Sequence, residues 1–529
     1  MPANASGPTR RDLLLRIGLT AGTAAMYQAM TALGHAEESQ FRGTPELGRA
    51  RRGDSVVVLG AGLAGLAAAY ELDKAGYRVQ LLEYQDRAGG RNWTLRGGDT
   101  YTELGGATQK VGFAAGNYFN PGPWRIPHHH RAILHYCKQF GVQLEPFIQF
   151  NNNAYVHSTN AFGGRPQRYR DGASDFIGNI SELLGKSVNQ NNLDQVLTKE
   201  DRERLLVALR EWGMLDASYS YRKGLHVSTR RGYERPPGGG PDGAPIASDL
   251  LPFSDVLDPC VWNTMKFFMT YEMQPTMFQP VGGMDMIGKA FARHVGRLIT
   301  FNRKVTAIAQ DDSGVTVSHA DRVSGAAGQT RADWCVCAMP LTVLAQIPVQ
   351  VSPKMQAGIR AVPYSSHAKI GMEFRRRFWE EDEAIYGGIS FTSQEIALIS
   401  YPNDRMHSSG PAVLLGGFPL NLAGLDFAAM TPEQRLETAL KQGEVIHPQY
   451  RREFMNGTSV AWSRVPWMLG CRARWSEADR KAYYQDLVAL DGRIVLAGDH
   501  ASYLGGWQEG ALLSSMDAVK RLHKRAQEA

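Results

Sequence analysis

The chain is poor in cysteine, nearly balanced in charge and short of long apolar runs, and each scarcity excludes a class of protein. Five cysteines among 529 residues cannot build the dense disulfide framework of a small secreted domain. Beyond the N-terminal stretch, no segment offers the ~18 uninterrupted apolar residues of a membrane-spanning helix. The formal charge is only +6, and the basic runs are short and lack interleaved aromatic residues. Neither nucleic acid nor a membrane surface is therefore an expected partner.

What remains is the composition of an ordinary globular protein. Hydrophobic residues make up 43% of the chain and charged residues 21%, which excludes disorder as its main theme. A chain of 529 residues is too long for one core, so two or three domains are expected. The 56 glycines indicate many tight turns and a ligand site lined by backbone.

A pair of arginines near the N-terminus predicts a targeting signal rather than part of the fold. Arg10 and Arg11 precede a mildly apolar stretch and then "GHAE", a small-residue cleavage site. This pattern resembles a twin-arginine export signal over residues 1–36, a route that carries proteins already folded around a cofactor. A basic disordered tail is the alternative, and the apolar stretch after the arginines argues against it. We expect an exported protein, periplasmic or secreted.

The stretch "SVVVLGAGLAGLAAAYELDKAGYRVQLLE" predicts a strand, a glycine turn, a helix and a second strand. Gly60 would make the tight turn, Gly62 would let the backbone approach a pyrophosphate, and Gly65 would allow close packing of helix on strand. Ala64 lies in the first helical turn, whose free N–H groups favour phosphate. Glu83 ends the second strand, where its carboxylate can accept both ribose hydroxyls. Together these features predict a dinucleotide site.

Two further motifs favour FAD over NAD. "DRAGGRNWT" places Gly90 and Arg91 directly after the dinucleotide fingerprint, adding N–H groups and a fixed cation. Near the other end, "AGDH" closes a strand, and Asp499 is suited to hold ribitol hydroxyls. A helix beginning near Gln508 would direct its positive dipole end at the ligand above that turn, which favours an anionic reduced flavin.

The ordered motifs resemble the flavin-containing amine oxidase superfamily and, within it, bacterial L-amino acid oxidases. The matching pieces include "VVVLGAGLAGLAAAYEL", "GGR", "ELGGA", "GPWRIP", "VGGMD", "YSSHAKIGMEFRRRFWE", "AGDH" and "GGWQEGA", and they span about residues 52–525. The resemblance implies an α/β fold, with a Rossmann-like FAD-binding domain of the amine oxidase type, a β-sheet substrate domain and a helical subdomain. It also implies FAD. No cysteine stands beside "GGWQEG", so we expect a non-covalent link.

The pattern of elements and the resemblance divide the chain after the export signal. The FAD-binding domain is assigned to residues 52–107, 281–340 and 455–525, and the substrate-binding domain to residues 108–130 and 341–454. The helical subdomain takes residues 131–280, with a Gly/Pro-rich surface loop or mobile lid at 224–250. A homo-oligomer, a dimer, is expected.

Arg125 in "GPWRIP" is the residue on which the substrate prediction depends. Prolines on both sides stiffen its segment. The resemblance implies that Arg125 binds the substrate carboxylate, for which a planar guanidinium offers two parallel charge-assisted bonds. The alternative is a structural arginine that caps a helix or pairs with Glu103.

Lys369 in "SSHAKIGMEF" has two interpretations. Strand alternation places it on the polar face, and by pattern alone that face would meet water. The resemblance instead implies a lysine that binds a water near flavin N5 and assists the reaction of O2 or the hydrolysis of the imine.

The resemblance completes the expected site. It places Gly506 and Trp507 over the flavin, with the glycine carbonyl accepting a bond from the substrate amine. Trp467 and Trp462 would wall the substrate pocket, although a core role suits them equally well. The expected residues are these: Lys369, Arg125, Trp507 and Gly506 as the catalytic set; Arg125, Gly506, Trp507 and Trp467 around the substrate; and Gly60, Gly62, Ala64, Gly65, Glu83, Gly90, Arg91, Arg125, Val305, Asp499 and Trp507 around the cofactor.

The run of three histidines at 128–130 suggests a metal, but we expect none. Adjacent side chains diverge at a helix start, and no acidic or cysteine partner is spaced for tetrahedral ligation. A surface run at a helix N-terminus is the prediction. The sequence also departs from the family, with Gly416 where some members place a tyrosine and no histidine in "MKFFMTYEMQP". These departures leave the preferred substrate side chain open.

The predicted reaction is oxidative deamination of an L-amino acid to a 2-oxo acid, ammonia and hydrogen peroxide. A monoamine or polyamine oxidase would share every motif except the need for Arg125. A flavin monooxygenase that forms an amide with loss of CO2 would also use such an arginine. A non-enzymatic FAD-binding protein is a further alternative.

We expect the rate of amino acid oxidation to rise with pH. The neutral amine is the reactive form, and it is a minor species below the amine pKa. The check is the initial rate of peroxide release from about pH 6 to about pH 9 with a stable enzyme. A rate that fell steadily over this range would contradict the prediction.

Overall fold

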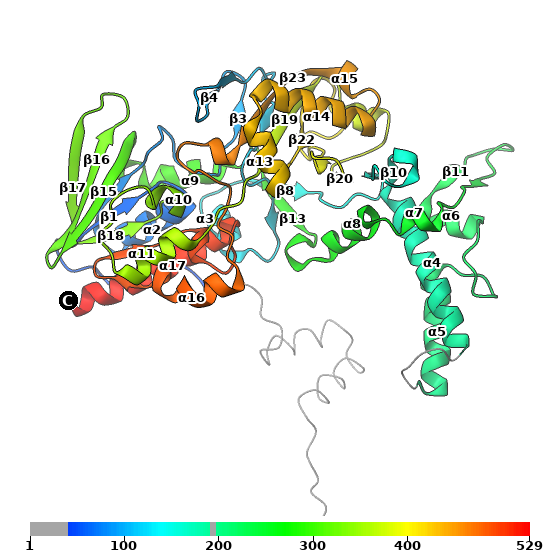
Figure 1. Ribbon diagram of the computed structural model, residues 1–529, viewed down its shortest axis with the longest axis horizontal. Coiled ribbons are helices and arrows are strands. Elements are labelled where there is room, and N and C mark those ends of the chain that lie inside the picture. The colour runs from blue at the N-terminus through cyan, green and yellow to red at the C-terminus, as the bar shows by residue number, and fades with distance from the viewer. Residues whose placement is uncertain (1–40, 191–196) are drawn as a thin grey trace, which may run out of the picture.

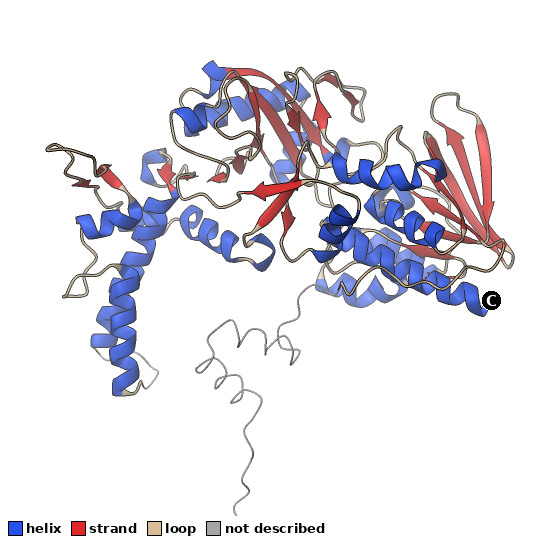
Figure 2. Ribbon diagram, turned by 180° about the vertical axis from the view of Figure 1, so that it is seen from behind, coloured by secondary structure: helices blue, strands red, loops and turns tan. Residues whose placement is uncertain are grey.

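The computed structural model describes residues 41–190 and 197–529, so the predicted export signal at residues 1–36 lies outside the described residues. Two sheet-containing lobes lie side by side, and a helical arm extends from one of them (Figure 1). Seen from behind, a three-stranded sheet and the helical arm occupy opposite ends of the molecule (Figure 2). None of the helices in the described ranges is long and apolar enough to cross a membrane.

A six-stranded sheet forms the core of the first lobe. Its strands, in spatial order, are β14 (Ile299–Thr300), β2 (Arg78–Leu82), β1 (Ser55–Leu59), β18 (Trp334–Cys337), β25 (Ile494–Leu496) and β24 (Leu490–Asp491). Neighbours from β14 to β25 are parallel, and β24 is antiparallel. Strand β1 reads as a continuous apolar run because an interior parallel strand is buried on both faces. The sheet is therefore assembled from segments far apart in the chain, as the sequence predicts.

Three helices pack with this sheet, and their apolar residues share one core: α2 (Leu63–Lys74), α9 (Asp285–Val295) and α17 (Gln508–Glu528). The antiparallel strands β15 (Arg303–Asp311), β16 (Gly314–Asp321) and β17 (Ala327–Ala332) form the outer three-stranded sheet. Helices α10 (Leu341–Leu344), α11 (Pro353–Ala361) and α16 (Glu477–Val488) complete the lobe (Figure 1).

A seven-stranded sheet forms the second lobe. Its order is β10 (Gln167–Arg168), β9 (Tyr155–His157), β20 (Ile389–Thr392), β21 (Leu398–Ser400), β22 (Ala412–Gly417), β19 (Ala368–Phe374) and β23 (Phe454–Ala461). Helices α12 (Phe378–Glu381), α13 (Asn421–Ala429), α14 (Pro432–Ile446) and α15 (Tyr450–Glu453) belong to this lobe. Strand β19 lies between β22 and β23, and all its residues are buried. Strands β9, β10 and β23 come from segments assigned above to other domains, whose boundaries stay a prediction.

The helical arm contains α4 (Tyr169–Asn189), α5 (Lys199–Gly213), α6 (Leu225–Arg231), α7 (Phe253–Val256) and α8 (Pro259–Met269). The segment 224–250 was predicted to be a loop, but it holds α6 and the paired strands β11 (Tyr233–Arg235) and β12 (Ile246–Ala247). A buried ion pair between Arg231 and Asp175 anchors it to α4, with Nε and Oδ1 2.9 Å apart. The abundant glycine and proline obscured these short elements, because both residue types disfavour helix and strand interiors.

A small antiparallel sheet connects the arm to the lobes. Strand β13 (Met277–Pro280) lies between β7 (Ile126–Pro127) and β8 (Leu144–Phe147). The turn η2 (Tyr271–Met273) precedes β13, and α3 (Arg131–Gln139) follows β7. The segment that carries Arg125 is thereby fixed beside the segment that leaves the arm. The remaining short elements are β3 (Leu95–Arg96), β4 (Thr100–Thr102), β5 (Thr108–Lys110), β6 (Tyr118–Phe119), η1 (Phe162–Gly164), η3 (Gly296–Leu298), η4 (Trp462–Arg464) and η5 (Asp499–Ala501).

Candidate active site

The glycine turn between β1 and α2 has the geometry of a phosphate-binding loop. Gly60 has a φ of +96°, a conformation that L side chains rarely adopt. A Cβ on Gly65 would lie 1.9 Å from the Gly60 carbonyl oxygen, so only glycine allows this approach of helix to strand. A Cβ on Gly62 would meet nothing within 4 Å, so the backbone there faces open space. The three glycines thus fit the three roles expected for a dinucleotide site.

Glu83 lies at the end of β2, beside this turn. Its carboxylate accepts a hydrogen bond from the Ala61 N–H and one of 2.7 Å from the Gln85 N–H. Burial raises the pKa of Glu83, although these backbone donors oppose the shift. A buried carboxylate at the carboxyl end of a strand, next to the glycine turn, fits an adenosine ribose.

The second glycine segment lies against the first. Gly62 and Gly89 form an isolated parallel bridge, and a Cβ on Gly90 would come 3.0 Å from the Gly62 Cα. Arg91 forms an ion pair with Asp499, with Nη1 and Oδ2 3.1 Å apart. Burial opposes the charge on Asp499, but Arg91 outweighs it and lowers the pKa of that carboxyl group. The fold therefore gathers the four predicted cofactor-binding segments at one edge of the sheet, and they fit FAD.

Ala64 and Val305 have different surroundings. The Ser515 hydroxyl donates a 2.7 Å hydrogen bond to the Ala64 carbonyl, which joins α2 to α17 beside the glycine turn. Val305 lies on β15, and its side chain packs in the core with Val57 and Leu82. A cofactor contact by Val305 stays a prediction.

Arg125 is buried, and no acidic side chain among residues 41–190 and 197–529 pairs with it. Its side chain is 6% exposed, and its Nε and Nη1 atoms have no hydrogen-bond partner in the described part of the chain. Its Nη2 lies 3.2 Å from the Met273 sulfur, and its guanidinium carbon lies 4.8 Å from the centroid of the Trp124 ring. Burial lowers the pKa of Arg125 to about 9. Buried guanidinium groups are normally paired, so this geometry points to an anionic ligand.

Glu103, the partner of Arg125 in the alternative structural interpretation, pairs with another arginine. Glu103 forms a buried, bidentate ion pair with Arg435, with oxygen–nitrogen distances of 2.8 and 3.0 Å. Arg464 also lies 3.2 Å from Glu103. The prediction that Arg125 pairs with Glu103 in a structural role is therefore wrong.

The Lys369 amine and the Arg125 guanidinium both contact the Trp124 ring. Its Nζ donates to the Gly122 carbonyl and lies 4.5 Å from the Trp124 centroid and 5.0 Å from the Phe418 centroid. The side chain is only 3% exposed, so the water-facing interpretation is wrong. Alternation predicted the face correctly, but another layer of residues covers that face. Burial and the charge of Arg125 lower the pKa of Lys369 to about 7.

The contact of Phe418 with Lys369 was not predicted from the sequence, where the comparison with the family pointed to Gly416 instead. A Cβ on Gly416 would meet the Met372 sulfur at 2.2 Å, so a side chain there would point into the core of the second lobe. Phe418, two residues later, presents its ring to Lys369. The bulge in the pairing of β19 with β22 changes the alternation at this point, which the sequence does not reveal.

Gly506 and Trp507 immediately precede α17. The Gly506 N–H donates a 2.9 Å hydrogen bond to Asp499, and its φ is +82°. The Trp507 and His130 rings pack in a T-shaped arrangement, with centroids 5.0 Å apart. These contacts place the start of α17 beside both the predicted ribitol-binding acid and the segment after Arg125.

Trp462 and Trp467 belong to an aromatic cluster with Trp93. Trp462 is 1% exposed, and its indole N–H donates a 2.8 Å hydrogen bond to the Pro121 carbonyl, so it is a core residue. The Trp467 ring lies 5.8 Å from that of Trp462 and 6.3 Å from that of Trp93. These contacts do not join Trp467 to Arg125 or Lys369, and its place in the substrate pocket stays a prediction.

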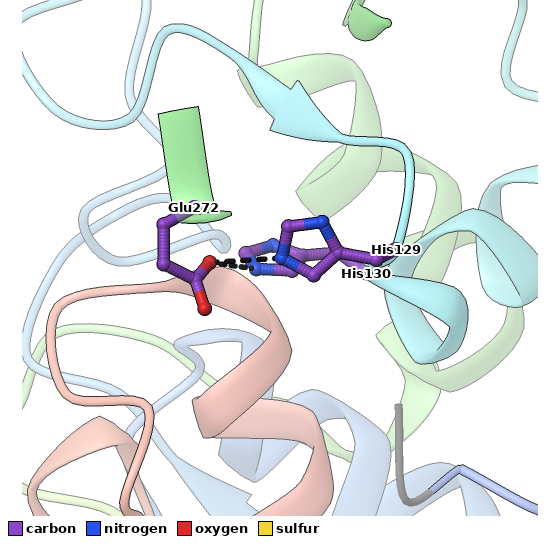
Figure 3. A group of neighbouring side chains, drawn as sticks. All are labelled: His129, His130 and Glu272. Atoms are coloured by element: carbon purple, nitrogen blue, oxygen red, sulfur yellow. Dashed lines mark hydrogen bonds and ion pairs between the residues drawn. The ribbon is translucent and has the colours of Figure 1, made fainter. Parts of the chain in front are cut away.

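The histidine run was predicted to be a surface feature, and this is wrong for two of its three members. His129 is 8% exposed and His130 is 1% exposed, whereas His128 does face solvent. Both buried rings point to the Glu272 carboxylate (Figure 3). The expected divergence fails because α3 begins only at Arg131, so the histidines are not helical. Glu272 follows more than a hundred residues later, and no local signal in the sequence links it to the histidines.

Comparison with known proteins assigns the same class of fold and chemistry. The family described as flavin containing amine oxidoreductase matches residues 63–523. An L-amino-acid oxidase of Siganus canaliculatus is 28% identical, over 89% of this chain and 85% of its own length. An L-amino-acid oxidase of Vipera ammodytes ammodytes is 26% identical, over 89% of this chain and 93% of its own length. The solved structure of cyclohexylamine oxidase from Brevibacterium oxydans IH-35A is similar in fold, with a TM-score of 0.59, 18% identity and coverage of 90% of this chain and 100% of its own.

We expect Lys369→Met to remove a pH dependence of stability. The pKa of Lys369 is about 7 in the folded protein against an ordinary value of 10.5, so the unfolded chain binds more protons between these values. The contribution of neutral Lys369 to wild-type stability should therefore rise with pH across this window. That contribution should be lost as the pH falls to about 7. The variant should gain on the wild type as the pH falls.

The measurement is thermal unfolding of purified holoprotein across that window. Lys138→Met, at an exposed position, is the matched control and should follow the wild-type profile. Parallel profiles for Lys369→Met and the wild type would contradict the prediction.

Proposed function

The chain belongs to the family of flavin-containing amine oxidoreductases, and we propose that it is an FAD-dependent L-amino acid oxidase. The observation that carries the proposal is the buried guanidinium of Arg125, whose Nε and Nη1 atoms have no partner among the described residues. A carboxylate would supply the missing charge and two parallel hydrogen bonds. A simple amine has no carboxylate, so it would supply neither the charge nor the hydrogen bonds.

The relatives support this choice, since those cited above are named L-amino-acid oxidases. When bound, FAD supplies the two-electron acceptor for the amine carbon, and O2 accepts these electrons in turn. The overall conversion takes an L-amino acid, O2 and water to a 2-oxo acid, ammonia and hydrogen peroxide.

Arg125 positions the substrate in this proposal. Its carboxylate-binding fork fixes one end of the amino acid, which leaves the α-carbon and amine free to be oriented. The Trp124 and Phe267 rings, with centroids 4.8 and 5.9 Å from the guanidinium carbon, exclude water and strengthen the ion pair with the substrate.

Lys369 supplies a nearby group that can gain or lose a proton. With a pKa of about 7, its amine is divided between the neutral and charged forms near neutral pH. A lysine in this state can hold a water and exchange a proton with it, which suits O2 reduction or imine hydrolysis. Burial is the main cause of this low pKa, and binding of a substrate carboxylate at Arg125 would offset the smaller part that the charge of Arg125 contributes.

Arg125→Ala should separate amino acids from amines. We expect kcat/KM for an L-amino acid such as phenylalanine to fall by about 30-fold to several thousand-fold, equivalent to about 2–5 kcal/mol for a lost buried charge pair. Oxidation of phenethylamine, which has no carboxylate, should not fall. The measurement is peroxide release with both substrates at matched FAD content.

Arg49→Ala is the control for that comparison, because Arg49 is exposed and is not one of the residues of the candidate site. An equal loss of amino acid and amine oxidation, or no loss of either, would remove the basis for the carboxylate role. Product analysis also separates a 2-oxo acid with free peroxide from an amide with CO2.

We further propose that residues 1–36 direct the folded protein out of the cytoplasm through the twin-arginine route. Support comes from the paired Arg10 and Arg11 and the apolar stretch after them. The homodimer likewise stays a prediction.

Replacing both arginines by lysine tests the export proposal. The variant should accumulate in the cytoplasm of a host with this pathway, whereas the wild type should appear outside it, as measured by fractionation. Export of both proteins alike would show that the arginine pair is not an export signal.

A further inference from the structure

Two histidines and a glutamate converge beside the carboxylate-binding segment (Figure 3). The Nε2 atoms of His129 and His130 lie 3.0 and 2.9 Å from the same Oε2 of Glu272. The three ligand-type atoms lie within 4.8 Å of one another. No other set of three such side chains converges in this way in the described part of the chain.

We propose that His129, His130 and Glu272 bind a divalent transition-metal ion of the zinc type. Bonds of about 2.0–2.2 Å to imidazole nitrogen and carboxylate oxygen in a tetrahedron separate the ligand atoms by about 3.3 Å. The two nitrogen–oxygen separations of 2.9 and 3.0 Å need to open by only a few tenths of an ångström. The two histidine nitrogens, which lie within 4.8 Å of each other, would approach to about 3.3 Å by rotation of the rings. A set of two imidazoles and one carboxylate, without a thiolate, suits Zn²⁺.

The site has the burial expected of a built metal site with an entrance. His129 and His130 are 8% and 1% exposed, so packing restricts their rings. Glu272 keeps 25% of its side chain exposed, which leaves access from one side. Three protein ligands leave a fourth position for water or another ligand.

The protein holds the two ligand segments together without the metal. The His128 N–H donates a 3.0 Å hydrogen bond to the Thr276 carbonyl, and β7 pairs with β13 just beyond. The histidines and Glu272 are thereby preorganised by backbone bonds, so metal binding would not have to order either segment.

Metal binding at this position would stabilise the neighbourhood of Arg125. Met273 directly follows Glu272, and its sulfur lies 3.2 Å from the Arg125 Nη2. The Trp507 ring packs against His130 on the other side. The ion would therefore fix the end of the helical arm against both the carboxylate-binding arginine and the start of α17.

The test is zinc binding to untagged holoprotein after removal of metals by a chelator. Equilibrium dialysis with elemental analysis should find about one Zn²⁺ per chain in the wild type. His130→Ala and Glu272→Gln should each weaken binding by at least about 100-fold, since even loss of an outer partner costs 10–100-fold. His128→Ala changes the exposed neighbour of the same run and should bind like the wild type.

Thermal unfolding gives an independent reading of the same site. Zn²⁺ should raise the Tm of the wild type and of His128→Ala, because a ligand that binds only the folded state stabilises it. It should not raise the Tm of His130→Ala or Glu272→Gln, and flavin content will show whether these variants are folded.

Wild-type protein without stoichiometric zinc, or equal binding by all variants, would overturn the proposal and leave a cluster held by hydrogen bonds alone. The metal site does not depend on the proposed oxidase reaction. Zinc binding should persist in Arg125→Ala, so failure of one proposal can be distinguished from failure of the other.

Discussion

A buried guanidinium with no acidic partner among the described residues is the constraint around which this site is organised. Removing a charge from water costs several kcal/mol unless a partner of opposite sign compensates. Arg125 has aromatic rings and a methionine sulfur for neighbours, which offset only part of that cost. Burial, and to a lesser degree the charge of Arg125, lowers the pKa of the nearby Lys369. We therefore propose that this site binds an anion, and a zwitterionic amino acid carries a suitable one.

The buried acids of the two lobes are already paired with other arginines. Glu103 is occupied by Arg435, and Asp499 is occupied by Arg91, so neither acid is free to neutralise Arg125. The nucleotide lobe presents its glycine turn and the start of α17 at the carboxyl ends of its parallel strands. The second lobe supplies Lys369 from a strand buried on both sides, where the protonation state of an amine can be shifted.

Local patterns were strong enough to predict the cofactor half of the site. The glycine turn, Glu83 and Asp499 each follow a strand, and Arg91 belongs to a short glycine motif, so these positions are determined by a few neighbouring residues. Arg125 and Lys369 were identified mainly by resemblance, because an isolated arginine or a lysine in an alternating strand has a commoner structural explanation. The burial of Lys369 and the ring of Phe418 beside it depend on packing between layers and on a bulge, neither of which is a local property.

The sequence by itself determined the dinucleotide fold, the flavin and the order of the motifs, because steric rules for glycine and hydrophobic periodicity act over short distances. Only the tertiary structure decided which charges are neutralised. It paired Glu103 with Arg435, left Arg125 with no acidic partner in the described part of the chain, and brought Glu272 to two histidines more than a hundred residues away. Whether a charge is paired or exposed depends on contacts between distant segments, and no local pattern specifies those contacts.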